Sequence, residues 1–167
     1  MANDPWSYAG TSEHSQQVAL FMWANMAEKF GLLIADDPFS YTKAGFAKTQ
    51  FENAGKLGYK LLSHPVKQLK WLHAVHNQGH GDAIRGAKAK AEGVKAGVSD
   101  IFLPVPIRES VYNVYYHGLY IELKAGKNNP TDVQLEFIHD ATMAGYCAKV
   151  AYGWLEARKI ILDYLQI

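Results

Sequence analysis

Apolar and polar residues alternate in the segment 120–126, YIELKAG. Successive side chains of a β-strand point to opposite faces, so Ile121 and Leu123 share one face while Glu122 and Lys124 share the other. A solvent-facing strand with charges that favour solubility would explain a carboxylate and an ammonium group two residues apart. A metal site with a functional lysine would explain them equally well. The rest of the sequence has to distinguish these two interpretations.

Helical spacing of apolar residues predicts three main helices. The first covers residues 12–30, with Ser12 as its N-cap and Gly31 at its end. The second runs from about residue 131 to 144, and a closing helix covers about 154–165.

Extended segments lie between these helices. The predicted strands are residues 71–76, a strand that begins near Asp100 and is broken by Pro104 and Pro106, residues 111–125 with a bend at Gly118, and residues 146–152. This order predicts an α/β fold, a central mixed β-sheet flanked by helices. Residues 36–65 do not fit the order and are predicted to form a helical insertion or cap. No linker divides the chain, so residues 1–167 are predicted to be a single domain.

Length and composition describe one ordinary globular domain. The chain has 167 residues, of which 49% are hydrophobic and 20% are charged. No apolar run approaches the roughly 20 residues that cross a bilayer, and the N-terminus lacks the pattern of a secretory signal. The single cysteine, Cys147, excludes an internal disulfide and a cysteine-based zinc cluster. We therefore expect a cytoplasmic protein that makes no membrane contact.

The net charge of +1 hides a strong asymmetry along the chain. Residues 43–95 contain ten Lys/Arg and three Asp/Glu, whereas the remainder contains seven Lys/Arg and thirteen Asp/Glu. A basic segment of this kind is typical of a surface that faces a polyanion such as DNA or RNA. Folding can also mix the two segments in space, so charge alone leaves this open.

Asp100 supplies the partner that Glu122 needs for a metal site. It lies where a loop enters a predicted strand, and Glu122 follows 22 positions later on the next long strand. Two antiparallel strands would bring the carboxylates together, where like charges are destabilising unless a cation neutralises them. Mg²⁺ prefers such oxygen ligands, and the backbone carbonyl of Leu123 is a further candidate. Lys124, on the face of Glu122, would orient a water or neutralise charge on a phosphate, which suits phosphodiester hydrolysis.

Two segments carry a resemblance to a known superfamily. The run GVSDIFLPVP at 97–106, followed by GLYIELKAG at 118–126, is similar to the PD-(D/E)XK nuclease motif, with Ser99 in place of the usual proline. More narrowly, the chain resembles the virus-type replication-repair nuclease (VRR-NUC) family. The supporting features are Glu13, AVHNQG at 74–79, AKAKAEGVKAGVSD at 87–100, HGLYIELKAG at 117–126, Gln134, and GYCAKVAYGWLEA at 145–157.

The resemblance implies a restriction-endonuclease-like core and a metal-dependent, structure-selective DNA endonuclease that works with Mg²⁺ or Mn²⁺. Stand-alone members of the family resemble Holliday-junction resolvases that act as homodimers. The expected partners are therefore branched DNA, a four-way junction or a flap, and a second copy of the chain. A phage or prophage setting, with action in the host cytoplasm, is also implied. The alternatives are a non-cleaving nucleic-acid-binding module of the same fold and an α/β protein unrelated to nucleic acid.

The resemblance also assigns roles to residues outside the central motif. Glu13, on the first helix, would reach the metal, although the helix dipole favours an acid in any first turn. Gln134 would lie near the active site, although Thr131-x-x-Gln134 is also a capping box. The predicted catalytic residues are Asp100, Glu122, Lys124 and Gln134, and the predicted metal ligands are Glu13, Asp100, Glu122 and the Leu123 carbonyl.

Basic residues gather just before Asp100, around a short Ala/Lys helix predicted over roughly 83–92. The four basic residues are Arg85, Lys88, Lys90 and Lys95. A solvated helix is the ordinary explanation, but the position just before a metal ligand favours contacts with DNA phosphates. The resemblance places Asn77, in the preceding glycine-rich loop, beside the DNA as well.

Overall fold

The structure is a computed structural model that describes residues 9–36, 64–75, 87–88, 90–108 and 115–167. These residues belong to two compact units, 1–70 and 71–167, and each unit is described by itself. Within the part of the chain that the structure describes, no helix is both long and apolar enough to cross a membrane.

The first unit contains helix α2 (Glu13–Phe30), followed by the short helix α3 (Leu32–Ala35). The hydroxyl of Ser12 accepts a hydrogen bond from the backbone N–H of Ser15 at 3.1 Å, as expected of an N-cap. Gly31 separates the two helices with a φ of 85°, a conformation that glycine adopts without strain. The predicted first helix is confirmed, together with the break at its end.

The second unit is built on a four-stranded mixed sheet. In spatial order the strands are β1 (His73–Ala74), β2 (Ile101–Leu103), β5 (Leu119–Lys124) and β6 (Cys147–Tyr152). β1, β2 and β5 are antiparallel neighbours, whereas β5 and β6 run parallel. Parallel strands need a crossover, and helix α7 (Asp132–Met143) supplies it. The predicted mixed sheet and the predicted helix over about 131–144 are confirmed.

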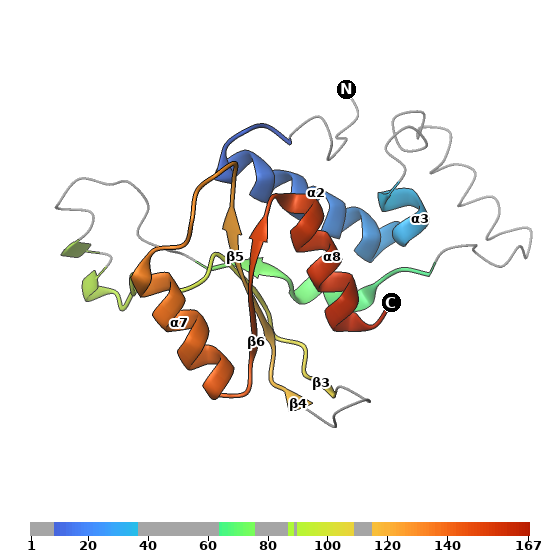
Figure 1. The fold of residues 1–167 in the computed structure, drawn as a ribbon. Helices are drawn as coiled ribbons and strands as arrows, with labels where there is room; N and C mark the ends of the chain where they lie inside the picture. The colour runs from blue at the N-terminus through green and yellow to red at the C-terminus, as the bar shows by residue number, and fades with distance from the viewer. Residues whose placement is uncertain (1–8, 37–63, 76–86, 89, 109–114) are drawn as a thin grey trace, which may run out of the picture. The chain divides into compact units, whose positions relative to one another are not determined.

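Helices α7 and α8 (Trp154–Leu165) lie on opposite sides of β5 and β6 (Figure 1). Tyr120 of β5 makes an edge-to-face contact with Phe137 of α7, with 5.1 Å between the ring centroids. Alternate residues of β5 therefore face α7, and the residues between them face away from it. The residues that face away are buried: Leu119, Ile121 and Leu123. This side of β5 contributes to the apolar core of the second unit.

A separate two-stranded ribbon pairs β3 (Ile107–Arg108) with β4 (Tyr115–Tyr116). The sequence did not predict β3, because the two prolines that follow β2 interrupt the hydrophobic pattern. The predicted bend at Gly118 separates β4 from β5. A Cβ atom at Gly118 would lie 2.7 Å from the ring of Phe102, so glycine permits the chain to pass close to β2.

The remaining predictions are contradicted in part, or concern residues that the structure describes only in part. Among the described residues of the predicted strand 71–76, only His73 and Ala74 form a strand. The prediction begins too early because a 3₁₀ helix, η1 (Lys67–Trp71), extends to residue 71. The described residues of the predicted helix 83–92 include helical positions 87, 88, 90 and 91. The predicted insertion near 36–65 lies outside the described residues except at its ends, and the single-domain organisation stays a prediction.

Candidate active site

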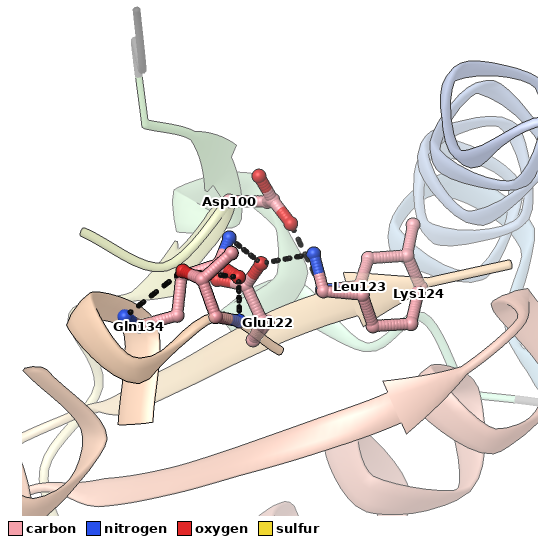
Figure 2. A network of polar contacts seen from close by, with 6 residues as sticks. Asp100, Glu122, Leu123, Lys124 and Gln134 are labelled. Carbon is pink, nitrogen blue, oxygen red and sulfur yellow. Dashed lines mark hydrogen bonds and ion pairs between the residues drawn. The ribbon is translucent and has the colours of Figure 1, made fainter. Parts of the chain in front are cut away.

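The antiparallel pairing of β2 with β5 brings Asp100 and Glu122 together. Ile101 lies opposite Ile121 in the register, so Asp100, one residue earlier, lies opposite Glu122. The Oδ2 atom of Asp100 accepts a hydrogen bond from the backbone N–H of Leu123 at 2.9 Å (Figure 2). The structure therefore contains the convergence of carboxylates that the strand spacing predicts.

The side chain of Glu122 is completely buried. Its Oε1 atom accepts hydrogen bonds from Lys124 Nζ, at 2.8 Å, and from Gln134 Nε2 (Figure 2). Its Oε2 atom is buried and has no hydrogen-bond partner among the described residues. A buried carboxylate oxygen without a hydrogen-bond partner destabilises the folded state. Such an oxygen can instead coordinate a cation.

Burial raises the pKa of Glu122 from 4.5 to about 7. The hydrogen bond and the charge of Lys124 oppose this shift, whereas the neighbouring Asp100 carboxylate adds to it. The site thus disfavours two negative charges unless a further cation is present. Raised pKa values of this origin are typical of functional sites, because burial and like charges are combined there.

Lys124 is only 6% exposed and lies on the same face of β5 as Glu122. The interpretation of this segment as a solvent-facing strand is therefore wrong, since both charged residues are buried. A buried ion pair adds little net stability compared with apolar residues of similar size. Packing alone gives no reason for the pair to lie here.

Gln134 takes part in two sets of interactions. Its Oε1 atom accepts from the N–H of Thr131 at 2.9 Å, and its backbone N–H donates to the Thr131 hydroxyl at 3.4 Å. These bonds close the predicted capping box at the start of α7. The Nε2 atom donates to Glu122. The capping box and the position at the site are compatible because they use different atoms of one amide.

Two residues just before Asp100, Gly97 and Ser99, also shape the site, although the sequence pattern assigns neither of them a role. Gly97 has a φ of 83°, and a Cβ atom there would lie 2.8 Å from the carbonyl oxygen of Val133. This close approach packs the loop against the first turn of α7, which carries Gln134. Ser99 is completely buried, and its hydroxyl has no hydrogen-bond partner among the described residues. The glycine is visible in the sequence, but its contact with Val133 depends on the fold.

The backbone of Leu123 offers a further oxygen on the side of Asp100. The N–H and C=O of one strand residue point toward the same neighbouring strand. Since the N–H of Leu123 donates to Asp100, its carbonyl is directed to that side as well. The two carboxylates and this carbonyl are the hard oxygen donors that Mg²⁺ and Mn²⁺ prefer. Within the described part of the chain nothing donates a hydrogen bond to Oε2 of Glu122, so this oxygen fits a ligand of such a cation.

This donor set is incomplete as it stands. Within the described ranges, no group of three His, Cys, Asp or Glu side chains is placed to hold a metal ion. Glu13 lies in the first turn of α2, in the first unit, and is partly exposed. Its role as a metal ligand stays a prediction. Water or substrate oxygens would complete the shell of an ion held by Asp100, Glu122 and Leu123.

Three of the predicted DNA-contacting residues are described, and all three are exposed: Lys88, Lys90 and Lys95. Lys88 forms an exposed ion pair with Glu92, with 3.9 Å between the charged atoms. Exposed lysines remain accessible to phosphates, since an exposed pair of this kind is weak. Two further predicted contacts lie outside the described residues: Asn77 and Arg85.

The fold and the site define a nuclease-type α/β domain with a restriction-endonuclease-like core. No family model matches the sequence, and no curated protein matches it either. The chain is similar to a solved structure described as a "VRR_NUC domain protein", with 30% sequence identity and a TM-score of 0.48. The match covers 73% of this chain and 87% of that one. By this identity and coverage the chain belongs to the VRR-NUC family, which confirms the resemblance inferred from its motifs.

Proposed function

We propose that this protein is a metal-dependent DNA endonuclease that hydrolyses phosphodiester bonds. The observation that carries the proposal is the buried carboxylate of Glu122. It lies opposite Asp100 and beside Lys124, and its Oε2 atom has no hydrogen-bond partner among the described residues. A protein that used these groups only for stability would gain little from them.

Asp100, Glu122 and the Leu123 carbonyl would hold a divalent cation, Mg²⁺ or Mn²⁺. When bound, such an ion polarises a phosphodiester and activates water as a Lewis acid. Glu122 has to be ionised to serve as a ligand, and a neighbouring cation favours its ionised form. Its raised pKa thus supports a site that is completed by a cation.

Lys124 supplies the second positive charge. Its Nζ atom is 2.8 Å from Glu122 Oε1, which fixes the ammonium group at the carboxylate pair. From this position it would donate a hydrogen bond to a phosphate oxygen or orient the attacking water. Because the group is buried, water screens its charge less than it would at the surface.

The proposed substrate is branched DNA, a flap or a four-way junction, and the proposed active form is a homodimer. The described residues of one chain contain one such carboxylate pair, so two matched cuts across a junction would require two chains. The exposed Lys90 and Lys95 precede Asp100 in the sequence and would contact phosphates near the cut. A phage or prophage enzyme that acts in the host cytoplasm fits this activity.

Cleavage assays on duplex, flap, splayed-arm and four-way-junction DNA test the proposal, each with Mg²⁺, Mn²⁺ or EDTA. We expect wild-type protein to cut only with a divalent cation, and Lys124→Met to lose activity by about 100-fold or more. Lys149→Met is the matched control. Lys149 is an exposed lysine on β6 that lies opposite Ile121 and therefore faces the other side of the sheet.

Comparing Lys124→Met with Lys149→Met separates the effect of losing the lysine at the site from the effect of losing a positive charge anywhere on the protein. Lys149→Met should retain wild-type activity, because its side chain does not share the face of Glu122. Tight binding of branched DNA by wild-type protein without metal-dependent cutting would contradict the nuclease function. That result would favour the non-cleaving binding module instead.

A further inference from the structure

Tyr152, the last residue of β6, lies beside Lys124. The parallel register pairs Lys124 with Tyr152, just as it pairs Glu122 with Val150. Paired residues of adjacent parallel strands project to the same face, with the strands about 4.8 Å apart. The aromatic ring therefore shares the face of the candidate active site, on the side of Lys124 away from β2.

Tyr152 is far more exposed than its neighbour. Its exposed fraction is 47%, whereas that of Lys124 is 6%. Its hydroxyl is 3.5 Å from Asn129 Oδ1, at the outer limit of a hydrogen bond. Among the described residues, no aromatic ring contacts it. The ring thus contributes little to the core, and its exposed face is available to another molecule.

The backbone that carries this ring is held firmly. The N–H of Tyr152 donates to Glu156 Oε2 at 2.8 Å, and the N–H of Gly153 donates to the carbonyl of Lys124 at 2.8 Å. The ring is therefore presented from the fixed end of a strand. The adjoining turn between β5 and α7 exposes a positive charge and an amide through Lys127 and Asn128.

We propose that Tyr152 contacts the substrate by stacking on an unpaired nucleotide next to the scissile phosphate. Proteins bind single strands with exposed aromatic rings beside basic groups, because every base offers a π-face. A base within a duplex already stacks on both neighbours, so it is not available to this ring. Tyr152 thereby favours flaps, splayed arms and opened junctions over continuous duplex. The inference rests on the proposed nuclease function and specifies its substrate selection.

Fluorescence of 2-aminopurine, placed at successive positions around the branch of a splayed-arm DNA, tests the stacking directly. Binding is measured with Ca²⁺, together with the affinity for a fully paired duplex. Stacking on an aromatic ring quenches the fluorescence of 2-aminopurine, so wild-type protein should quench it at the contacted position. We expect Tyr152→Ala to lose this quenching and to bind splayed-arm DNA about ten-fold or more weakly. Tyr152→Phe should retain both, and Tyr152→Trp should quench at least as strongly. Duplex affinity should not change in any variant.

Leu155→Ala is the matched control, because Leu155 is also 47% exposed but lies on α8, outside the pairing with Lys124. It should bind and quench as wild type does. Thermal melting shows whether each variant is folded. If Tyr152→Ala fails to fold, Tyr152→Leu replaces it, because leucine removes the aromatic ring but keeps apolar bulk at this exposed position.

Three results would overturn the inference: no loss in Tyr152→Ala, an equal loss in Tyr152→Phe, or an equal loss on continuous duplex. An equal loss in Tyr152→Phe would show that the hydroxyl, not the ring, makes the contact. None of these readouts requires cutting. Quenching without metal-dependent cleavage would therefore contradict the nuclease function alone, and normal cleavage with unchanged binding by Tyr152→Ala would contradict the stacking alone.

Discussion

Gln134 donates from its Nε2 atom to Oε1 of Glu122 (Figure 2). The Oε1 atom of the same amide accepts from the N–H of Thr131 at 2.9 Å. One side chain thus connects the first turn of α7 with a buried carboxylate of β5. Because Lys124 also donates to Oε1 of Glu122, both described donors use the same oxygen and leave Oε2 for a ligand.

Gln134→Ala and Thr131→Ala should therefore have different effects on activity. Each variant removes part of the capping box, and we expect each to lower the free energy of unfolding by about 1 kcal/mol. Only Gln134→Ala also removes the donor to Glu122, so only this variant should lower metal affinity or cleavage, by about 10- to 100-fold. Denaturant unfolding and metal titration of the cleavage rate measure the two effects. Equal activity losses in the two variants would show that Gln134 acts only through the helix.

The stability of the metal-free protein should fall as the pH rises from about 4.5 to about 7. Burial raises the pKa of Glu122 from 4.5 to about 7, so in this range the folded protein binds a proton that the unfolded chain has released. This contribution is complete below pH 4.5 and is lost as the pH rises through 7. It amounts to a difference on the order of 3 kcal/mol.

Unfolding by denaturant in EDTA, at pH values between 4 and 8, measures this dependence. Other groups also titrate in this range, so the informative quantity is the difference between wild type and Glu122→Gln. The neutral amide of the variant should remove the contribution of Glu122 and flatten the dependence. The same dependence in both proteins would mean that Glu122 is ionised throughout the range.

The alternation in residues 120–126 and the spacing to Asp100 were sufficient to predict two antiparallel strands with converging carboxylates. They were not sufficient to predict that Glu122 is buried. In a strand with one solvated face, the polar positions are the exposed ones, and the pattern alone suggests this for Glu122. The polar face is buried here because α7 crosses over it between β5 and β6, and that arrangement is a property of the whole sheet.

Elsewhere, features that depend on local interactions were predicted correctly, whereas some that depend on the fold were missed. Ser12 and Thr131 mark the beginnings of two helices because caps are local interactions. The two-residue strand β3 follows two prolines and has no local pattern that favours it. Nothing in the sequence distinguishes Tyr152 from the other aromatic residues, because its position beside Lys124 depends on the pairing of β5 with β6.

Gly97→Ala should destabilise the protein more than Gly93→Ala does. Both glycines have positive φ, 83° and 89°, so alanine is strained at either position by about 1–2 kcal/mol. At Gly93 a Cβ atom would meet nothing within 4 Å, whereas at Gly97 it would lie 2.8 Å from the backbone oxygen of Val133. Thermal or denaturant unfolding of the two variants isolates the effect of that contact. Equal destabilisation would mean that the loop moves away from α7 without cost.

Mn²⁺ should stabilise the folded protein through the carboxylate pair. A ligand that binds only the folded state adds about 2.7 kcal/mol at one hundred times its Kd, which corresponds to roughly 5–10 °C in Tm for a chain of this size. Asp100→Asn should abolish most of this shift, although its amide oxygen can still accept from Leu123. Asp163→Asn, an exposed carboxylate paired with Lys159 on α8, is the control and should retain it. A full Mn²⁺ shift in Asp100→Asn would place the metal elsewhere.

The exposed lysines before Asp100 should set the salt dependence of DNA binding. Each lysine that neutralises a phosphate releases condensed counterions, so its removal should lower the slope of log K against log salt by about 0.7–0.9. We expect this change for Lys90→Ala and for Lys95→Ala, since both side chains are exposed. Lys159→Ala is the control, because Lys159 is also an exposed lysine but lies on α8, outside the segment before Asp100. Binding constants measured from about 50 to 200 mM salt give the slopes. If all three variants had the slope of the wild type, the segment before Asp100 would not contact DNA.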